Sequence, residues 1–423
     1  MTGSTLLSLR SRRDRGEKYG ITSVCSAHPD VIRAALLLGR DIGQPVLIEA
    51  TCNQVNQDGG YTGMTPANFR GFVERIAGSV GFDAGNLIFG GDHLGPNPWK
   101  HLPTADAMAK AQEMVAAYAK AGFSKLHLDC SMGCAGEEEA LADEVVAERA
   151  AALAAVAESN SANLPVYIIG TEVPVPGGAS HAVDRLDVTD PAAALRTFDV
   201  HSRSFAKRGL EAAFERVVGL VVQPGVEFGN TNVIAYAPDQ AKSLSHALSD
   251  MNNVVFEAHS TDYQTKEALS ALVDDGFAIL KVGPGLTFAL REALYGLDLV
   301  AAELYGGSPT LKNKLEAIMM SDRSHWEKYY PGNLTQQRVQ RHYSYSDRIR
   351  YYWNQPAARA AVEELKQRLG NVRIPETLVS QYLAPALSQV RSGEIEPEFE
   401  AIKAAYVQAI LRDYASACGH HVS

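Results

Sequence analysis

Eight short runs of mostly aliphatic residues, separated by stretches long enough to form helices, most constrain the fold of this chain. Strands that are covered on both faces are apolar throughout, so continuous runs of this length predict buried parallel strands. The stretches between them leave room for the crossover of a dozen residues that parallel neighbours require. The predicted strands lie at residues 21–27, 45–51, 86–92, 125–131, 166–173, 219–226, 254–260 and 278–283.

Strict alternation of strands and helices predicts a parallel sheet with helices outside it. Thr65-Pro66 and Asp190-Pro191 indicate two of the helix starts, each with an N-capping side chain before a proline at the first helical position. Eight units in succession favour an α/β fold closed into a (β/α)8 TIM barrel. An open, doubly wound sheet is the alternative, but no glycine-rich dinucleotide fingerprint follows the first predicted strand.

Composition narrows the class of protein further. Apolar residues make up 46% of the 423 residues and charged residues 21%, which is ordinary for a soluble globular protein. A formal net charge of −10 repels phosphate backbones, so we expect no nucleic-acid partner. No run of 18 apolar residues occurs, so we expect no membrane span. The five cysteines are odd in number and far apart, which suits reduced thiols and a cytoplasmic protein.

The alternation of strands and helices stops after a predicted last barrel helix, which ends at Gly306-Gly307-Ser308-Pro309. We therefore expect residues 1–306 to form the barrel with its N-terminal segment, and residues 307–423 to form a helical extension. That extension would pack on the barrel or on a partner, and an oligomer is expected. Within it, residues 342–353 interleave aromatic residues with arginines, as packed interfaces do, although an ordinary core with arginine stems would look similar. Helices are predicted at 311–320, 356–370, 375–390 and 397–417.

Polar residues follow the predicted strands at their carboxyl ends, where barrel enzymes carry their catalytic groups. If the barrel closes, these acids converge on one mouth, and several carboxylates cannot all stay ionised there without a compensating cation. Lys281 supplies one positive charge, and a divalent metal is the natural second. The acids at the strand ends are Glu49, Asp92, Asp129 and Glu172, with Glu257 as a further candidate.

His93 and His259 are the nitrogen ligands that we predict for such a metal. With Glu172 they would form a three-ligand site open to water and substrate, which is the composition of catalytic zinc. Mn²⁺ and Fe²⁺ also suit mixed nitrogen and oxygen ligands. The alternative is that each histidine is a hydrogen-bonded structural residue. Cys130 and Cys134 are four residues apart, but no second cysteine pair completes a structural zinc site.

A metal beside carboxylates suits sugar chemistry, because it stabilises charge that develops on a ketose oxygen. We expect Asp129 or Glu49 to shuttle a proton, with Asp92 and Lys281 as further catalytic groups. Bond cleavage beside a hydroxyl gives an aldolase, and recapture on the other face gives an epimerase. Side-chain amides that could bind substrate hydroxyls, or simply pair with their own loops, are those of Gln54, Asn97 and Gln223. Gly283 and Gly285 could hold a phosphate at the start of the last barrel helix.

Several motifs together resemble the GatZ/KbaZ family over essentially the whole chain. They are Gly-Asp-His-Leu-Gly-Pro at 91–96, Leu-Asp-Cys-Ser at 128–131, Gly-Thr-Glu-Val-Pro at 170–174, Glu-Ala-His-Ser-Thr-Asp-Tyr-Gln at 257–264 and Tyr-Ser-Asp-Arg-Ile-Arg-Tyr-Tyr-Trp at 345–353. The resemblance implies a barrel and a role in tagatose or galactitol catabolism, as the Z subunit of D-tagatose-1,6-bisphosphate aldolase. That subunit is held to be non-catalytic and to support a class II aldolase Y subunit. Members also carry the label tagatose-6-phosphate kinase, and some relatives look like metal-dependent ketose C4-epimerases.

The same resemblance compares His93 and His259 with metal ligands of class II aldolases, and Glu172 with their acidic residue on strand five. One departure is that the glycine-rich phosphate loop expected after His259 reads Ser-Thr-Asp-Tyr at 260–263. Three readings follow: a metal-dependent enzyme acting on a ketose or ketose phosphate, a non-catalytic subunit that stabilises an aldolase partner, and a sugar-phosphate kinase. The kinase finds least support, since no Gly-x-x-x-x-Gly-Lys-Ser/Thr loop or protein-kinase signature occurs.

Overall fold

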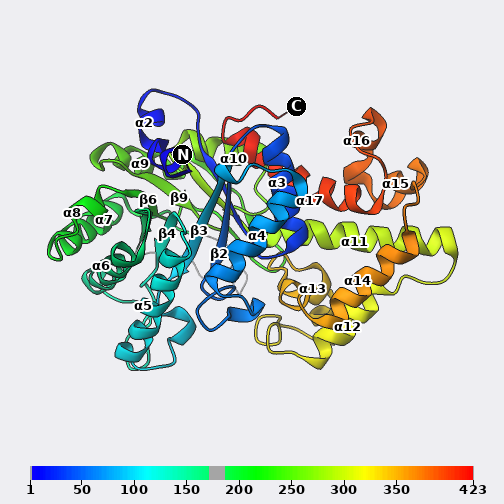
Figure 1. Cartoon of the computed structure of the whole chain (residues 1–423), viewed down its shortest axis with the longest axis horizontal. Coiled ribbons are helices and arrows are strands. Elements are labelled where there is room, and N and C mark those ends of the chain that lie inside the picture. Colours follow the sequence, from blue (N-terminus) through cyan, green and yellow to red (C-terminus); the bar gives the residue numbers. More distant parts are fainter. Residues whose placement is uncertain (1, 171–185, 423) are drawn as a thin grey trace.

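Eight parallel strands close into a barrel in the computed structural model, which describes residues 2–170 and 186–422 (Figure 1). Consecutive strands are neighbours around the barrel, except that a short hairpin of β7 (Glu227–Phe228) and β8 (Val233–Ile234) follows the sixth. The predicted TIM barrel is therefore confirmed. Its strands are β1 (Ile21–Cys25), β2 (Val46–Thr51), β3 (Leu87–Leu94), β4 (Lys125–Leu128), β5 (Val166–Ile169), β6 (Val217–Val221), β9 (Val255–Ala258) and β10 (Ile279–Val282).

Helices surround the barrel, and their starts follow the expected capping chemistry. The Thr65 side chain accepts from the backbone N–H of Asn68, and Asp190 accepts from Ala192 and Ala193, so both predicted helix starts are confirmed. A short helix, α8 (Glu211–Phe214), precedes β6. The main helices of the ring are α3 (Pro29–Asp41), α4 (Pro66–Val80), α5 (Thr104–Lys120), α6 (Asp143–Asn160), α7 (Pro191–Ala206), α9 (Pro238–Ala247), α10 (Lys266–Asp274) and α11 (Pro284–Tyr305).

The amino-terminal end of the barrel is closed by two short helices that the sequence did not predict. These are α1 (Thr2–Leu7) and α2 (Leu9–Asp14). Leu6 and Leu9 are fully buried in one apolar cluster with side chains of the barrel strands, among them Leu47. This end is thus filled with aliphatic side chains, and polar chemistry is left to the opposite mouth.

The extension follows α11, which runs out of the barrel towards a helical lobe (Figure 1). The prediction of one continuous helix over 375–390 is wrong. Pro385 lacks the N–H that a continuous helix requires, and the helix is interrupted there. The helices are α12 (Leu311–Ser321), α13 (Leu334–Tyr343), α14 (Pro356–Leu369), α15 (Glu376–Tyr382), α16 (Leu387–Ser392) and α17 (Phe399–Ala417), with 3-10 turns η5 (Arg348–Tyr352) and η6 (Ala384–Ala386).

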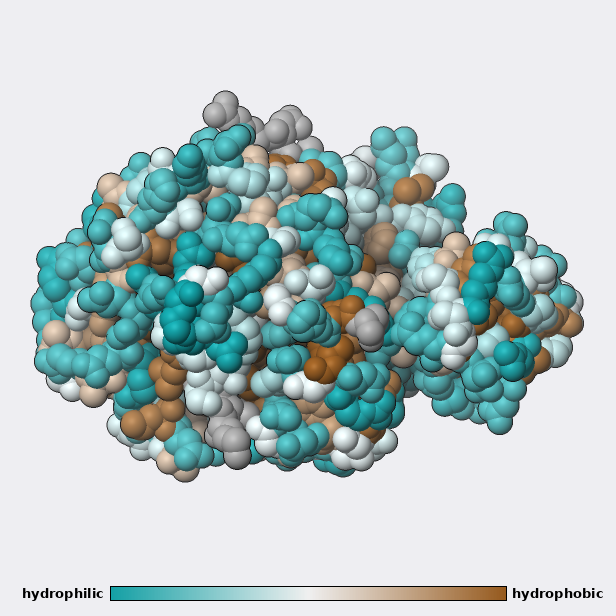
Figure 2. Space-filling view, turned by 90° about the horizontal axis from the view of Figure 1, so that it is seen from above, coloured by the Kyte–Doolittle hydropathy of each residue, from teal (hydrophilic) through white to brown (hydrophobic). Residues whose placement is uncertain are grey.

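The extension packs back on the barrel of its own chain. The last helix, α17, lies against α3, α10 and α11 (Figure 1). Lys403 on α17 forms an ion pair with Asp30 on α3, with 3.0 Å between Nζ and Oδ2. Figure 2 shows that the surface seen from above is mostly hydrophilic, with hydrophobic residues in separate small patches. Among the described residues, no helix is both long and apolar enough to cross a membrane.

Candidate active site

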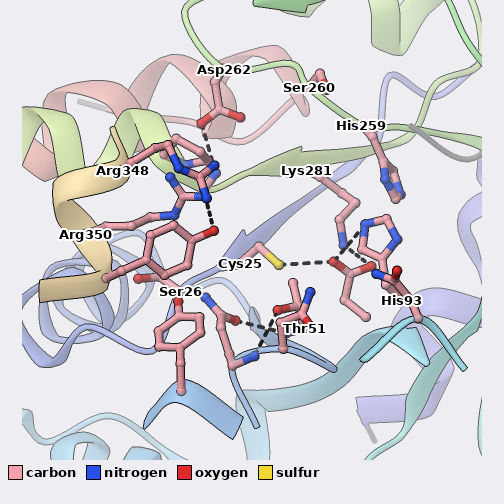
Figure 3. Close-up of a pocket in the computed structure, with 18 of the residues that line it drawn as sticks. Cys25, Ser26, Thr51, His93, His259, Ser260, Asp262, Lys281, Arg348 and Arg350 are labelled. Carbon is pink, nitrogen blue, oxygen red and sulfur yellow. Dashed lines mark hydrogen bonds and ion pairs between the residues drawn. The ribbon is translucent and has the colours of Figure 1, made fainter. Parts of the chain in front are cut away.

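A cavity of about 920 Å³ opens at the carboxyl ends of the barrel strands, within the size range of small-molecule sites. The strand ends supply its inner surface, with Asp92, His93, His259 and Lys281 among the lining side chains. The extension supplies the facing side, mainly from η5 and the residues around it. Figure 3 shows Arg348 and Arg350 on one side of this cavity and His93, His259 and Lys281 on the other.

Beneath the cavity lies a network of buried charges, which we call the charged floor: Glu49, Asp92, Lys125, Glu257 and Lys281. Lys125 Nζ lies 2.6 Å from Glu49 Oε1 and 2.8 Å from Glu257 Oε2. Lys281 Nζ lies 2.6 Å from Glu49 Oε2 and 2.7 Å from Asp92 Oδ1. Burial would raise the pKa of Glu49, but the two lysines hold it below its usual value. The floor therefore neutralises much of its own charge without a ligand.

Three imidazoles stand above the charged floor, and one of them, His127 on β4, was missed by the sequence analysis. The ring centroids of His93 and His127 are 5.0 Å apart, and those of His93 and His259 are also 5.0 Å apart. His127 Nδ1 lies 2.9 Å from Asp92 Oδ1, while its Nε2 is buried without a hydrogen-bond partner among the described residues. A buried nitrogen without a partner is costly, so this atom is available to bind a ligand.

The donors around His127 fit a divalent metal. Ligand atoms of Asp92, His127, Glu257 and His259 all lie within 4.8 Å of one another. Burial lowers the pKa of His259 to about 3, against the opposing influence of Glu257, so its imidazole is neutral at neutral pH and can coordinate a metal. Mixed imidazole and carboxylate donors suit zinc and its first-row neighbours. His93, predicted as a ligand, lines the same cavity, whereas Glu172 lies outside the described residues.

The two carboxylates predicted to shuttle protons, Glu49 and Asp129, are not among the residues that line the cavity. Glu49 is fully buried between the lysines of the charged floor. Asp129 lies behind His93, accepting from its Nδ1 at 2.8 Å and from the Ser131 hydroxyl at 2.7 Å. His93 itself has a φ of +51°, a left-handed conformation that costs energy for any residue with a Cβ atom. Asp129 therefore orients a strained His93, and its placement favours a positioning role over direct proton transfer.

The predicted substrate-binding amides do lie at the cavity. Gln54, Asn97 and Gln223 all line it. The side-chain oxygen of Gln54 accepts from the Thr51 backbone, and that of Gln223 accepts from the backbone N–H of Gly225, at 2.9 and 2.8 Å. These bonds fix both amide planes by their carbonyl ends, and Gln54 also donates a hydrogen bond to the Tyr61 hydroxyl, so the NH₂ end of Gln223 is the better placed of the two to face a ligand.

The phosphate cradle predicted at Gly283 and Gly285 already holds a carboxylate of the protein. Asp262 Oδ1 accepts from the backbone N–H of Gly283 at 2.9 Å and from that of Gly285 at 2.7 Å. Asp262 thus occupies the amino-terminal end of α11, the place where many barrels hold a phosphate. These hydrogen bonds argue against the prediction that the two glycines bind phosphate, because their donors are already used within the chain.

Glu227 on β7 is a cavity carboxylate that the sequence analysis did not select. Burial raises its pKa to about 7, while the backbone N–H of Phe228 opposes that shift by donating to Oε1 at 2.9 Å. A carboxylate that titrates near neutral pH can both accept and return a proton. Burial also raises the pKa of Asp262 to about 6, but both glycine amides engage the same oxygen of Asp262. Glu227 is therefore the better candidate for acid–base chemistry.

Comparison with known proteins places this chain in a family. The sequence pattern described as D-tagatose-1,6-bisphosphate aldolase subunit GatZ/KbaZ-like matches residues 6–419. The chain belongs to the GatZ/KbaZ-like family. It is 55% identical over 420 residues, 98% of each chain, to a protein of Agrobacterium fabrum named D-tagatose 6-phosphate 4-epimerase. It also resembles a crystal structure described as a probable tagatose 6 phosphate kinase from Sinorhizobium meliloti 1021. That likeness has 59% identity and a TM-score of 0.89, covering 94% of this chain and all of the other.

The match to the GatZ/KbaZ-like family spans the extension as well as the barrel. The extension therefore belongs to the family's pattern, and in this chain it forms one side of the cavity through Lys328, Tyr329, Arg348, Arg350, Tyr351 and Trp353. The site is thus built from side chains of both regions.

Proposed function

We propose that this protein is a metal-dependent ketose-phosphate 4-epimerase that interconverts D-tagatose 6-phosphate and D-fructose 6-phosphate. The observation that carries the proposal is one cavity whose inner end gathers imidazoles and carboxylates and whose outer side carries two arginines. The 55% identity to a protein named D-tagatose 6-phosphate 4-epimerase supports the choice of sugar. The buried donors would serve a carbonyl or hydroxyl oxygen, and the arginines a phosphate.

The metal would be held by His127 and His259 with Asp92, Glu257 or His93 completing the set. Zinc fits these donors, and Mn²⁺ or Fe²⁺ would fit them too. When bound, the metal would supply a positive charge that polarises the substrate's carbonyl oxygen. Lys281 adds a fixed charge beside it, because Asp92 and Glu49 more than offset the effect of burial and hold the lysine's pKa well above its usual value.

The reaction needs no external oxidant if the carbon–carbon bond opens and closes again. A base takes the proton of the C4 hydroxyl, the C4–O bond becomes a carbonyl, and the C3–C4 bond breaks. Its electron pair moves into an enediolate of C1–C3, leaving an aldehyde that carries C4–C6 and the phosphate. The aldehyde rotates so that the other face of its carbonyl group points to C3. C3 then attacks this face, and the C4 oxygen takes back the proton. All atoms are conserved, and only the configuration at C4 changes.

In this scheme the chain's residues have separate tasks. Glu227 is the proposed base for the C4 hydroxyl and later returns the proton, because its pKa lies near neutral. Lys281 faces the oxygen on which negative charge develops. Asp129 holds His93 in its left-handed conformation, and the amide of Gln223 is placed to bind a substrate hydroxyl.

A single preparation tests the proposal against the other two functions. The purified chain is analysed for bound metal and then offered D-tagatose 6-phosphate, D-tagatose 1,6-bisphosphate, and D-tagatose 6-phosphate with ATP. We expect about one bound metal ion and formation of D-fructose 6-phosphate without ATP. His259→Gln should lose both metal and turnover, whereas His246→Gln, an exposed histidine on α9, should keep both.

Two results would contradict the epimerase. A chain that is inert alone and only raises the bisphosphate cleavage of an added class II aldolase Y subunit would be the stabilising subunit that the family description suggests. ATP-dependent formation of the 1,6-bisphosphate would identify a kinase instead.

A further inference from the structure

Arg348 and Arg350 on η5 line the cavity, and neither lies within ion-pair distance of a carboxylate in the described part of the chain, although Asp347 and Asp262 attract Arg350 from further away. Arg348 is only 8% exposed, stacks 3.4 Å over the Tyr329 ring and donates from Nε to the His325 carbonyl. Neither of its Nη atoms is hydrogen-bonded within residues 2–170 and 186–422. Arg350 donates to the carbonyls of Ser346 and Asp347 and to the Tyr351 hydroxyl at 2.9 Å. In the described part of the chain, neither arginine forms an ion pair with an acid.

A buried guanidinium without a counter-ion is unfavourable unless an anion joins it. The charged floor gives the contrast, since there each lysine contacts two carboxylates at 2.8 Å or less. Two adjacent arginines offer forked donors that match a phosphate, and Lys328 adds a third positive charge at the same cavity.

The amino-terminal end of α11, where many barrels bind a phosphate, is not open to one in this chain. The amides at the start of α11 are already bound by the Asp262 carboxylate. A phosphate placed there would meet that negative charge at close range and lose the two best backbone donors. The phosphate must therefore find its donors elsewhere in the cavity.

The arginine-bearing turn is held firmly against the barrel. Asp347, with a φ of +42°, accepts from the Thr287 hydroxyl at 2.6 Å and pairs with Arg291 at 3.4 Å, both on α11. The Tyr263 hydroxyl donates to the Tyr345 carbonyl at 2.6 Å. These bonds place Arg348 and Arg350 without help from a ligand, so their positions are set before substrate binds.

We propose that Arg348 and Arg350 of the extension bind the phosphate of the substrate, in place of the amino-terminal end of α11. The proposal rests on the proposed function, because it takes the ligand to be a phosphorylated ketose. During the reaction the phosphate stays on the aldehyde fragment, C4–C6. An arginine pair that holds this phosphate would keep the fragment in the cavity while its carbonyl group rotates to present the other face.

The test measures binding rather than turnover. Dissociation constants for D-tagatose 6-phosphate and for unphosphorylated D-tagatose are determined by calorimetry for the wild type, Arg348→Gln and Arg350→Gln. We expect each variant to bind the phosphorylated sugar at least tenfold more weakly and D-tagatose unchanged. Inorganic phosphate should compete in the wild type and at least tenfold less well in either variant.

The matched control is Arg338→Gln, an exposed arginine on α13 of the same extension, which should bind both sugars as the wild type does. Arg348→Lys and Arg350→Lys keep the charge and should recover part of the affinity, which separates phosphate binding from failure to fold. Unchanged preference for the phosphorylated sugar in the glutamine variants would overturn the proposal. So would an Asp262→Asn variant that strengthens phosphate binding tenfold while both arginine variants leave it unaltered.

Failure of the subsite and failure of the epimerase remain distinguishable. A wild type that epimerises while the arginine variants keep their phosphate preference refutes the subsite alone. A wild type that binds D-tagatose 6-phosphate through the arginines but never converts it refutes the epimerase alone and supports the subsite.

Discussion

The two sides of the cavity differ in how their charges are balanced. On the charged floor, each lysine contacts two carboxylates, and all five side chains come from barrel strands. On the facing side, Arg348 and Arg350 come from the extension and have no acidic partner among the described residues. The floor thus balances much of its own charge within the barrel. The arginine side keeps guanidinium donors outside any ion pair, which suits it to recognise an anionic group on a ligand.

The largest effect on stability is expected when one lysine of the charged floor is removed. Lys125→Met leaves Glu257 with only Lys281 at 4.0 Å and Glu49 with only Lys281 at 2.6 Å, since Lys125 is fully buried between the two carboxylates. We expect the free energy of unfolding to fall by about 3–5 kcal/mol, as when one member of a buried pair is removed. Denaturant titration measures this. The control, Lys110→Met, breaks half-exposed pairs with Asp58 and Glu113 and should cost less than about 1 kcal/mol. Equal losses in both variants would show that the floor does not depend on pairing.

A smaller effect is expected at Glu227, between the two sides. If Glu227 is the base it must be ionised, so kcat should rise as pH increases through about 7 and then level off. Glu227→Gln should lower kcat by about a hundredfold or more and remove this rise. The matched control is Glu139→Gln, an exposed carboxylate at the same cavity, which should keep the wild-type profile. If the rise persists in Glu227→Gln, the titration belongs to another group.

The smallest effect is expected from loss of the hydrogen bond that holds Asp347, the residue next to Arg348, against α11. Thr287→Val removes the hydroxyl that donates to Asp347, a hydrogen bond to a charged group. We expect a loss of about 1.5 kcal/mol in unfolding free energy and a several-fold rise in KM for the phosphorylated sugar. Ser324→Ala breaks a similar but exposed bond to Asp322 in the same extension and should change stability by less than about 0.5 kcal/mol. An unchanged KM in Thr287→Val would mean that this bond does not position the arginines.

The sequence predicted the floor side of the site far better than the arginine side. Apolar runs marked the eight strands, and polar residues at their ends included Asp92, His93, His259 and Lys281, which do meet at the cavity. Lys125 and His127 lie within β4 and not in the loop after it, so a search for polar residues at strand ends does not select them. Their signal was present: they alternate within an otherwise apolar four-residue strand, and alternate residues of a strand share one face.

The arginine side could not be placed from sequence because nothing local ties it to the barrel. The contacts that position Arg348 join Asp347 to Thr287 and Arg291, residues that lie 60 and 56 positions away. Hydrophobic periodicity finds helices in such an extension but not the surface on which they pack. Asp262 was likewise visible as a departure in the loop after His259, yet only its contacts with the Gly283 and Gly285 amides show that it fills the anion position.

The most direct test of the central claim follows the reaction in D₂O by NMR, with the metal-loaded chain alone and D-tagatose 6-phosphate. Opening and closing of the C3–C4 bond moves no carbon-bound hydrogen. We therefore predict D-fructose 6-phosphate that retains protium at both C3 and C4, formed without ATP or a second protein. Absence of product from a chain with full metal occupancy, or deuterium at C4 of the product, would contradict the account.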